Sequence, residues 1–316
     1  MIKDSHPLPD HLINFLEYLA VEKGLSNKTQ ENYKMFLHKF FEWLNENKLN
    51  DLKPHELTDD HIWKFRVWLS RSFNKIKKTP LKKSTQNYYL IALRAFLVFF
   101  TDRDILSLPA EKIKLAKNKD ERAVKFLNLD QVEKLLAMPK TETTTGLRDR
   151  AILEALFSTG LRVAELNSIN RDQVKIKKET KDLEISITGK GGRVRTVYFS
   201  DRAVAHLKNY LNKRTDNEKA LFINYRGPKM AVKRLTSRSV ENLVKRYALL
   251  AGISVLTTPH VLRHSFATDL LMQGVDLRTV QEFLGHKNIT TTQIYTHVTN
   301  QRLRDIHRKF HGGKKI

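Results

Sequence analysis

The chain has 316 residues, contains no cysteine, and carries 57 Lys and Arg against 34 Asp and Glu, which gives a formal net charge of +23. The absence of cysteine excludes thiolate nucleophiles, disulfides and cysteine-ligated zinc. The charge predicts a polyanionic partner, DNA or RNA, although a Lys-rich protein of the ribosomal kind would share this composition. No segment approaches about 18 consecutive apolar residues and the start lacks the apolar core of a signal peptide, so we expect a cytoplasmic protein without a membrane partner.

The N-terminal third is expected to form one domain of four packed helices, residues 1–108. Apolar residues recur there at three- and four-residue spacing, which is typical of amphipathic helices. The expected helices span residues 9–24, Ser26 to about Asn47, a segment capped by Thr58 or Asp59, and a segment capped by Ser84 or Thr85 that reaches Phe100. Four helices of this size make one compact bundle.

Basic residues gather just before the fourth helix, in the run FNKIKKTPLKKSTQN. A helix start preceded by lysines can dock on phosphates or enter a major groove, whereas a solvated Lys-rich loop would look the same in sequence. The candidate DNA contacts here are Lys82, Lys83, Ser84, Thr85, Asn87 and Arg94.

Residues 109–124 are polar and basic, with few apolar residues at helical spacing, and we expect them to link two domains. The linker would either join the two halves of a clamp around a DNA duplex or form an exposed tether. The second domain is expected over residues 125–305, followed by a basic tail, 306–316. Its expected elements are a helix capped by Asn128, helices over 144–158, 201–213 and 236–251, a possible strand at 221–223, and helices from about 259, from about 276 and around 290–296.

A short helix begins within the string TGLRVAEL, directly after the turn at Gly160. Arg162 opens this helix and Glu165 lies three residues further on. An arginine beside a tight turn and held by a nearby glutamate has a fixed guanidinium direction. An ordinary surface ion pair at this spacing is the alternative.

A hairpin is the one convincing β region, so the fold class is mainly α with a small β-sheet. Leu183, Ile185 and Ile187 alternate with polar residues, residues 189–192 form a turn, and a return strand follows with Val197 and Phe199. Lys190 lies at the hairpin tip, where it can reach a minor groove and protonate a leaving oxygen, or simply face solvent.

Chemistry-bearing side chains gather in the stretch from Pro259 to Val298. It contains His260, Arg263, His286 and Tyr295. A phenol can act as a nucleophile, an arginine can neutralise a phosphate, and histidines can move protons. This set predicts chemistry on a phosphodiester, with no metal and no cofactor.

Together these motifs resemble the tyrosine recombinase (lambda integrase-type) family, and most closely its Xer-like subfamily. The matching strings are TGLRVAEL, GKGGRVRTV, HVLRHSFATDLL and QEFLGHKNITTTQIYTHV, with all six chemical residues in the family's order. The resemblance covers nearly the whole chain. It implies an N-terminal four-helix core-binding (SAM-like) domain and a C-terminal tyrosine-recombinase catalytic domain.

The resemblance also implies DNA cleavage and rejoining without metal or nucleotide. Tyr295 would attack the phosphorus to give a 3′-phosphotyrosine, while Arg162 and Arg263 would stabilise the charge that develops on the phosphate oxygens. The expected roles of the other side chains are proton acceptor for His260, general acid for Lys190, phosphate donor or tyrosine positioner for His286, and orientation of Arg162 for Glu165.

The expected partner is double-stranded DNA with a specific recombination site, bound by a homotetramer or by a heterotetramer with a paralogue through a Holliday junction. An Xer-like role in resolving chromosome or plasmid dimers is favoured by the start of the bundle near residue 9, which leaves no arm-binding domain ahead of it. The alternatives are an integrase or excisionase of a mobile element, a type IB topoisomerase, and a DNA-binding accessory protein with an inactive site.

Base reading is expected from the fourth helix and from the helix around residues 236–247, which offers Arg238 and Asn242. Polar residues of these types on a helix are also typical of a solvated face.

Overall fold

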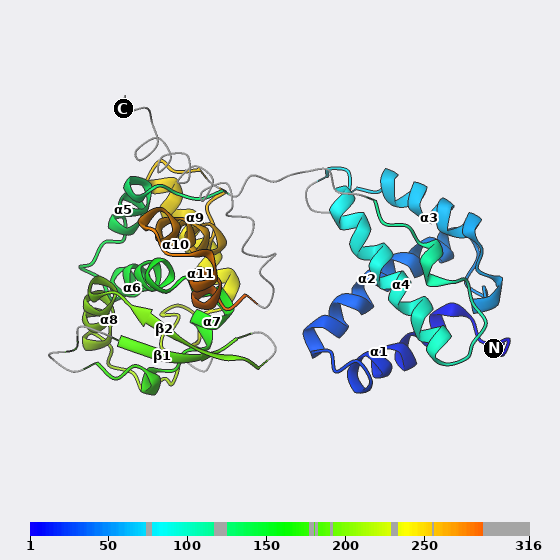
Figure 1. Cartoon of the computed structure of the whole chain (residues 1–316), viewed down its shortest axis with the longest axis horizontal. Coiled ribbons are helices and arrows are strands. Elements are labelled where there is room, and N and C mark those ends of the chain that lie inside the picture. The colour runs from blue at the N-terminus through cyan, green and yellow to red at the C-terminus, as the bar shows by residue number, and fades with distance from the viewer. Residues whose placement is uncertain are drawn as a thin grey trace, which may run out of the picture. The chain divides into compact units, whose positions relative to one another are not determined.

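The computed structural model describes residues 1–73, 78–116, 125–176, 180, 183–189, 192–228, 233–254 and 256–286. These residues divide into two units, Met1–Arg122 and Ala123–Ile316 (Figure 1). None of the described helices is both long enough and apolar enough to cross a membrane. Tyr295, Lys190, the expected helix around 290–296 and the basic tail lie outside the described residues.

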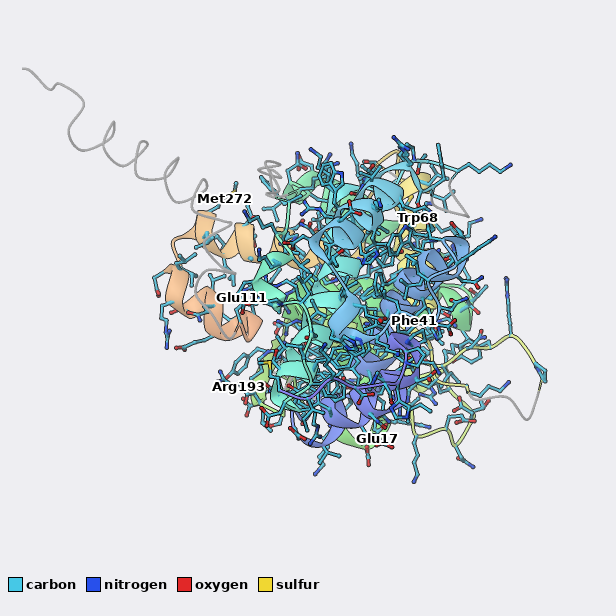
Figure 2. The ribbon with its side chains drawn as sticks, turned by 90° about the vertical axis from the view of Figure 1, so that its right-hand side faces the viewer. Glu17, Phe41, Trp68, Glu111, Arg193 and Met272 are labelled. Atoms are coloured by element: carbon cyan, nitrogen blue, oxygen red, sulfur yellow. The ribbon has the colours of Figure 1, made fainter. Side chains whose placement is uncertain are left out.

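In the described part of the first unit there are four α-helices, as the apolar spacing predicts. They are α1 (Leu12–Val21), α2 (Asn27–Glu46), α3 (Asp59–Arg71) and α4 (Lys83–Asp102), preceded by a 3-10 turn over Leu8–His11. Their inward faces form an aromatic core that includes the fully buried Phe15, Phe40, Phe65 and Phe96. Phe41 and Trp68, which are labelled in Figure 2, pack at the margin of this core.

Two details of this unit differ from expectation. Lys82, rather than Ser84 or Thr85, occupies the cap position of α4, so the two hydroxyl residues lie inside the first turn. The segment expected to begin the linker also packs onto the first core, because Ala110 and Ile113 are buried in it. Asn87 fixes this segment by donating from Nδ2 to the Ala116 carbonyl at 2.9 Å and accepting the Ala116 N–H at 3.1 Å.

The second unit is built around α6 (Thr144–Thr159), which is buried on most of its faces. It packs against α5 (Leu129–Ala137), α8 (Asp201–Asn212), α10 (Pro259–Gln273), the short α7 (Val163–Ser168) and strand β2 (Figure 1). Among the described residues of this unit, two further α-helices are α9 (Ser237–Leu250) and α11 (Leu277–Leu284). The expected positions of these helices are confirmed, with ends shifted by a residue or two.

The hairpin is confirmed as two antiparallel strands, β1 (Leu183–Thr188) and β2 (Val194–Phe199). Leu183, Ile185 and Ile187 are buried and their neighbours are exposed, as the alternation predicts. The expected strand at 221–223 is not formed as a strand: these buried residues are paired only through isolated antiparallel bridges, Ala220 with Asn170 just before the run and Ile223 with Arg234 at its end. The apolar run therefore reflects burial with local backbone pairing that does not extend into a sheet.

Helices α10 and α11 form a small layer with its own buried contacts among Ala267, Leu271, Val280 and Leu284. Gly274 and Gly285 end the two helices with φ values of 108° and 61°, so both turns use the left-handed region that glycine favours. Met272, near the end of α10, is exposed (Figure 2). The layer delivers Arg263 from the start of α10 and His286 from the turn after α11.

Gly160 ends α6 with φ 59°, and a Cβ added there would lie 2.5 Å from Cδ1 of Phe266. We expect Gly160→Ala to lower the free energy of unfolding by roughly 1–3 kcal/mol more than Gly252→Ala, because overpacking adds to the backbone strain. Gly252 is the matched control, since its φ is 66° but nothing lies within 4 Å of an added Cβ. Urea denaturation of both variants measures the difference, and equal losses would contradict it.

Candidate active site

Arg162 occupies the cap position of α7, immediately after the turn formed by Gly160 and Leu161. Its backbone N–H donates to Glu165 Oε2 at 2.9 Å and its Nη1 donates to Glu165 Oε1 at 2.9 Å. Its Nη2 lies 3.4 Å from the Gly285 carbonyl. The side chain is therefore held at both its backbone and its guanidinium, with about a third of its surface open to solvent.

Arg263 is a buried arginine that connects the two turns of the site. It is 4% exposed, its Nη1 donates to the Gly160 carbonyl at 2.6 Å, and its Nη2 donates to the Leu284 carbonyl at 2.5 Å. The first carbonyl belongs to the turn before Arg162 and the second to the turn before His286. One guanidinium thus fixes the spacing between the segments that carry the other two groups.

The backbone of His286 is tied to Gln281, whose carbonyl accepts the His286 N–H at 3.1 Å and whose Nε2 donates to the His286 carbonyl at 3.0 Å. Burial, reinforced by the charges of Arg263 and Arg162, lowers the pKa of His286 to about 4. The imidazole is consequently neutral at neutral pH. A bound phosphodiester would oppose this effect, because its negative charge favours the protonated form.

His260 lies in the first turn of α10. Loss of hydration and the neighbouring charges of Arg263 and Arg162 lower the pKa of His260. A neutral imidazole is the form that accepts a proton. His264, which the sequence did not single out, has its pKa lowered to about 4 by burial and by the adjacent His260 and Arg263.

Glu165 is nearly buried, at 6% side-chain exposure, and it bonds to two arginines. Arg195, on β2, donates to it twice, from Nη1 at 3.0 Å and from Nη2 at 2.8 Å. Burial alone would raise the pKa of this carboxyl, but the hydrogen bonds and charges of Arg195 and Arg162 hold the pKa at about 2. Glu165 is therefore ionised throughout the physiological range.

Arg195 also connects Glu165 to the other parts of the site. Its Nε donates to the Phe283 carbonyl at 3.2 Å, and a Cβ added at Gly285 would lie 2.9 Å from its Cδ. A Cβ added at Gly189, the residue before Lys190, would lie 3.2 Å from Arg195 Nη1 and 3.3 Å from Glu165 Oε1. The start of the hairpin turn thus lies beside the carboxylate that orients Arg162.

Sequence reasoning missed Arg195, although a signal was present. Arg195, Val197 and Phe199 alternate along β2, so they share a face, and the latter two are buried. A charged residue on the core face of a strand generally requires a partner of opposite charge. The partner here is Glu165.

The cavity beside His260 has a volume of about 320 Å³. Its lining includes His260, Arg238, Glu241, Asn242 and Lys245. Arg238 is exposed and pairs with Glu241 at 3.2 Å, so both expected α9 contacts face this open region. Among the expected contacts on α4, Lys82 and Lys83 are exposed, and Ser84, Thr85 and Arg94 are half-buried.

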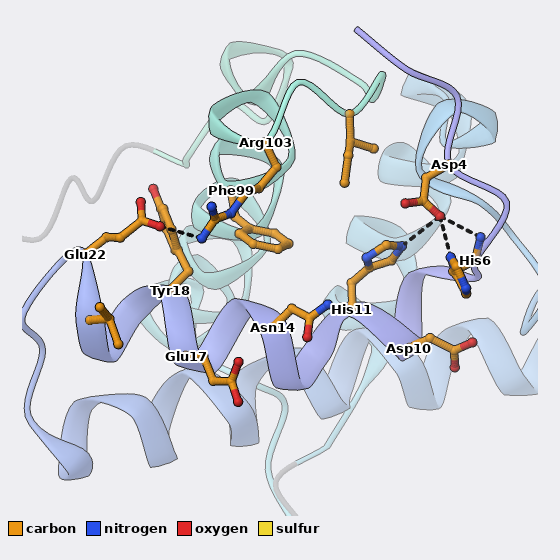
Figure 3. Close-up of a pocket in the computed structure, with 12 residues that line it drawn as sticks. Asp4, His6, Asp10, His11, Asn14, Glu17, Tyr18, Glu22, Phe99 and Arg103 are labelled. Carbon is orange, nitrogen blue, oxygen red and sulfur yellow. Dashed lines mark hydrogen bonds and ion pairs between the residues drawn. The ribbon is translucent and has the colours of Figure 1, made fainter.

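A larger cavity, of about 570 Å³, lies in the first unit between α1, the chain start and the end of α4 (Figure 3). Asp4, Asp10, Glu17 and Glu22 line it, and Asp4 lies between His6 and His11. Four carboxylates repel a phosphodiester, so cavity size does not mark the DNA site here. Within the described parts of the chain, no three His, Asp or Glu side chains are arranged to hold a metal ion.

Comparisons with known proteins match both units of the chain. Residues 125–302 match the Phage integrase family, and residues 12–104 match the Phage integrase N-terminal SAM-like domain. The tyrosine recombinase XerD of Listeria innocua is 37% identical over 96% of this chain and 98% of its own length. The tyrosine recombinase XerC of Natranaerobius thermophilus is 34% identical over 96% of this chain and 98% of its own length.

Among solved structures, the XerH site-specific recombinase bound to a palindromic difH substrate superposes with a TM-score of 0.74. The superposition covers 97% of this chain and 98% of that chain at 23% identity, which shows a shared fold. The two kinds of domain that the sequence predicts, an N-terminal SAM-like domain and a C-terminal integrase-type domain, are thus confirmed. The chain belongs to the phage integrase family of tyrosine recombinases, with Xer recombinases as relatives over nearly its full length.

Proposed function

We propose that this protein is a site-specific recombinase that breaks and rejoins DNA through a tyrosine nucleophile, without metal or nucleotide. The observation that carries the proposal is the convergence of Arg162, Arg263 and His286 on one pair of turns, through the bonds to the Gly160, Leu284 and Gly285 carbonyls. Full-length similarity to tyrosine recombinases supports it.

In the proposed reaction, the Tyr295 oxygen attacks the scissile phosphorus and the bond from phosphorus to the 5′-oxygen breaks. The product is a 3′-phosphotyrosine and a free 5′-hydroxyl. His260 takes the phenolic proton, since a phenol with a pKa of about 10 is mostly protonated at neutral pH. Lys190 gives a proton to the departing 5′-oxygen. The phosphotyrosine ester keeps the bond energy, so a second 5′-hydroxyl can reverse the step and rejoin a strand.

The two arginines supply the electrostatic part of this reaction. Negative charge grows on the non-bridging phosphate oxygens in the transition state, and guanidinium groups already fixed in place stabilise it without reorganising. Arg263 is fixed by two carbonyls, and Arg162 is fixed by Glu165. Neutral His286 contributes a hydrogen bond to a phosphate oxygen or to Tyr295.

The biological role that fits best is Xer-like exchange between two copies of one DNA site, as in the resolution of chromosome or plasmid dimers. Each active site cleaves one phosphodiester, so a complete exchange on two duplexes requires four protomers. We therefore propose a tetramer on DNA, made of this chain alone or with a paralogue, acting through a Holliday junction. The cytoplasm is the expected compartment for this reaction.

A plasmid assay tests the outcome of the reaction. The binding site is first selected from random duplexes with purified protein, and two copies are placed in one supercoiled plasmid. The proposal predicts two smaller circles, or an inverted segment, depending on the relative orientation of the copies. Relaxation of a plasmid that lacks the site, with no recombinant product from the two-site plasmid, would instead favour a type IB topoisomerase.

A further inference from the structure

A second cavity in the catalytic unit, here called the arginine cavity, lies against α9 and the loop after Ile223, with a volume of about 240 Å³. Its lining includes three arginines and no carboxylate. The arginines are Arg148 from α6, Arg226 from the loop and Arg246 from α9. Asn224, Ser239 and Asn242 add amide and hydroxyl groups to the lining. Among these lining residues, Asn242 is the one to which a role is given above.

The side chain of Arg148 is held in the wall of this cavity by hydrogen bonds. It is 7% exposed, its Nε and Nη2 donate to Asp149 Oδ1 at 2.9 and 2.6 Å, and its Nη1 donates to the Ile223 carbonyl at 2.8 Å. Its guanidinium also lies 5.6 Å from the centre of the Tyr225 ring. Three of the roughly five N–H donors of an arginine are used in these bonds, so the fork is held in one orientation against the cavity.

The charges around the arginine cavity do not balance. Asp149 is fully buried and takes bonds from Arg246 Nη2 at 2.8 Å and from the Tyr247 hydroxyl at 2.9 Å, besides those from Arg148. One carboxylate thus faces two arginines, and Arg226 adds a third cation at the exposed rim. Planar guanidinium forks match the oxygens of a phosphate, and an anion here would offset the excess charge.

Helix α9 places the arginine cavity next to the catalytic one. Asn242 lines both the arginine cavity and the cavity that contains His260. Ser239, Asn242 and Arg246 follow helical spacing on one side of α9, while Arg238, Asn242 and Lys245 follow it on the adjacent side. The two cavities therefore adjoin each other along α9.

We propose that the arginine cavity binds a backbone phosphate of the DNA duplex. This phosphate does not react and lies near the phosphodiester that is cleaved beside His260. The proposal rests on the proposed function, because it takes DNA as the source of the phosphate. The cavity then acts as a second anchor on the adjacent side of α9, and it sets the position of this helix on the duplex independently of base sequence.

The test compares DNA binding by Arg226→Gln and by the unchanged chain, both in a Tyr295→Phe background so that no covalent product forms. Arg226 is exposed, so the substitution leaves the buried network around Asp149 intact. We expect weaker binding to specific and unrelated duplexes alike, and a salt dependence of log K that is shallower by about 1. The matched control is Arg103→Gln, the same change at an exposed arginine of the first unit that lines neither cavity and should leave the salt dependence unchanged.

Duplexes with single uncharged methylphosphonate linkages then locate the phosphate. One linkage should weaken binding by the unchanged chain but have a much smaller effect on Arg226→Gln. The proposal would be overturned if Arg226→Gln left the salt dependence of binding unchanged. It would also be overturned if no linkage weakened binding by the unchanged chain more than binding by Arg226→Gln. The proposal would also be overturned if inorganic phosphate protected the unchanged chain from thermal unfolding better than chloride at equal ionic strength, while no methylphosphonate linkage had an effect that depends on Arg226. The site would then bind free phosphate and not a DNA phosphate. The readout is binding, so this inference can fail while strand cleavage stands.

Discussion

Replacing Arg263 with glutamine is expected to reduce the rate of covalent complex formation on DNA by at least about 10²–10³-fold. The substitution removes a fixed positive charge from the proposed phosphate site, where negative charge grows in the transition state. It also breaks the bonds that join the Gly160 and Leu284 carbonyls, so the segments carrying Arg162 and His286 lose their common anchor. Single-turnover cleavage of a nicked duplex, with the covalent product separated by denaturing electrophoresis, measures the rate.

Two further variants separate catalysis from folding in this experiment. Arg263→Lys keeps the charge but loses the fork, and we expect a rate between those of the unchanged chain and Arg263→Gln. Arg103→Gln, in the carboxylate-lined cavity of the first unit, should react at the unchanged rate. A folded Arg263→Gln, verified by its cooperative unfolding, that still reacts at the unchanged rate would remove Arg263 from the proposed site.

The second large effect concerns Glu165. Its pKa is held at about 2, against an ordinary value of 4.5, by Arg195 and Arg162 despite burial. A pKa that is lower in the folded chain means that the ionised carboxylate stabilises the fold, by about 3 kcal/mol at neutral pH. This contribution is fully present above about pH 4.5 and is lost as the pH falls through about 2. We expect Glu165→Gln to lower the free energy of unfolding by roughly this amount at pH 7.

Urea denaturation of Glu165→Gln and the unchanged chain between pH 7 and pH 3 tests both the size and the sign. The difference between the two proteins should be largest at pH 7 and should shrink as the pH falls below about 4.5. Glu282→Gln is the control, since Glu282 forms an exposed pair with Arg278, and its loss should cost less than about 1 kcal/mol. A Glu165→Gln loss that grows toward low pH would contradict this account.

The helices were largely predictable from sequence, because their apolar spacing reflects burial on one face. The stripes of α2 and α4 and the stop at Gly160 correspond directly to the structure. The start of α4 was misplaced because the hydroxyl residues Ser84 and Thr85 suggest caps, whereas Lys82 takes that position without a side-chain bond. The preference of hydroxyl residues for cap positions is a weak signal of where a helix begins, because a residue with extended backbone can precede the first turn without any side-chain cap.

The charged supports of the site were the harder part to predict. Asp149 follows Arg148 and precedes Arg150 in α6, and such a charged run is typical of a solvated face. In the structure Asp149 is fully buried, and it joins α6 to α9 through Arg246 and Tyr247. Periodicity cannot reveal this, because the partners are nearly a hundred residues apart and meet only in the folded chain.

The motif residues themselves were easier to identify than their surroundings. Arg162, Arg263 and His286 were expected to act together, and the structure brings them onto adjoining turns. Their order along the chain was enough to suggest the chemistry. The bonds that hold them, from Arg195 and from three backbone carbonyls, depend on tertiary contacts that the sequence does not display.

A nicked suicide duplex tests the central claim most directly, because the short fragment carrying the 5′-hydroxyl diffuses away after cleavage and traps the covalent intermediate. The unchanged chain should form an adduct that survives denaturation without added metal or nucleotide, and peptide mapping should place the DNA on Tyr295. Tyr295→Phe should form none. No adduct from the unchanged chain, an adduct on another residue, or an adduct from Tyr295→Phe would contradict the account.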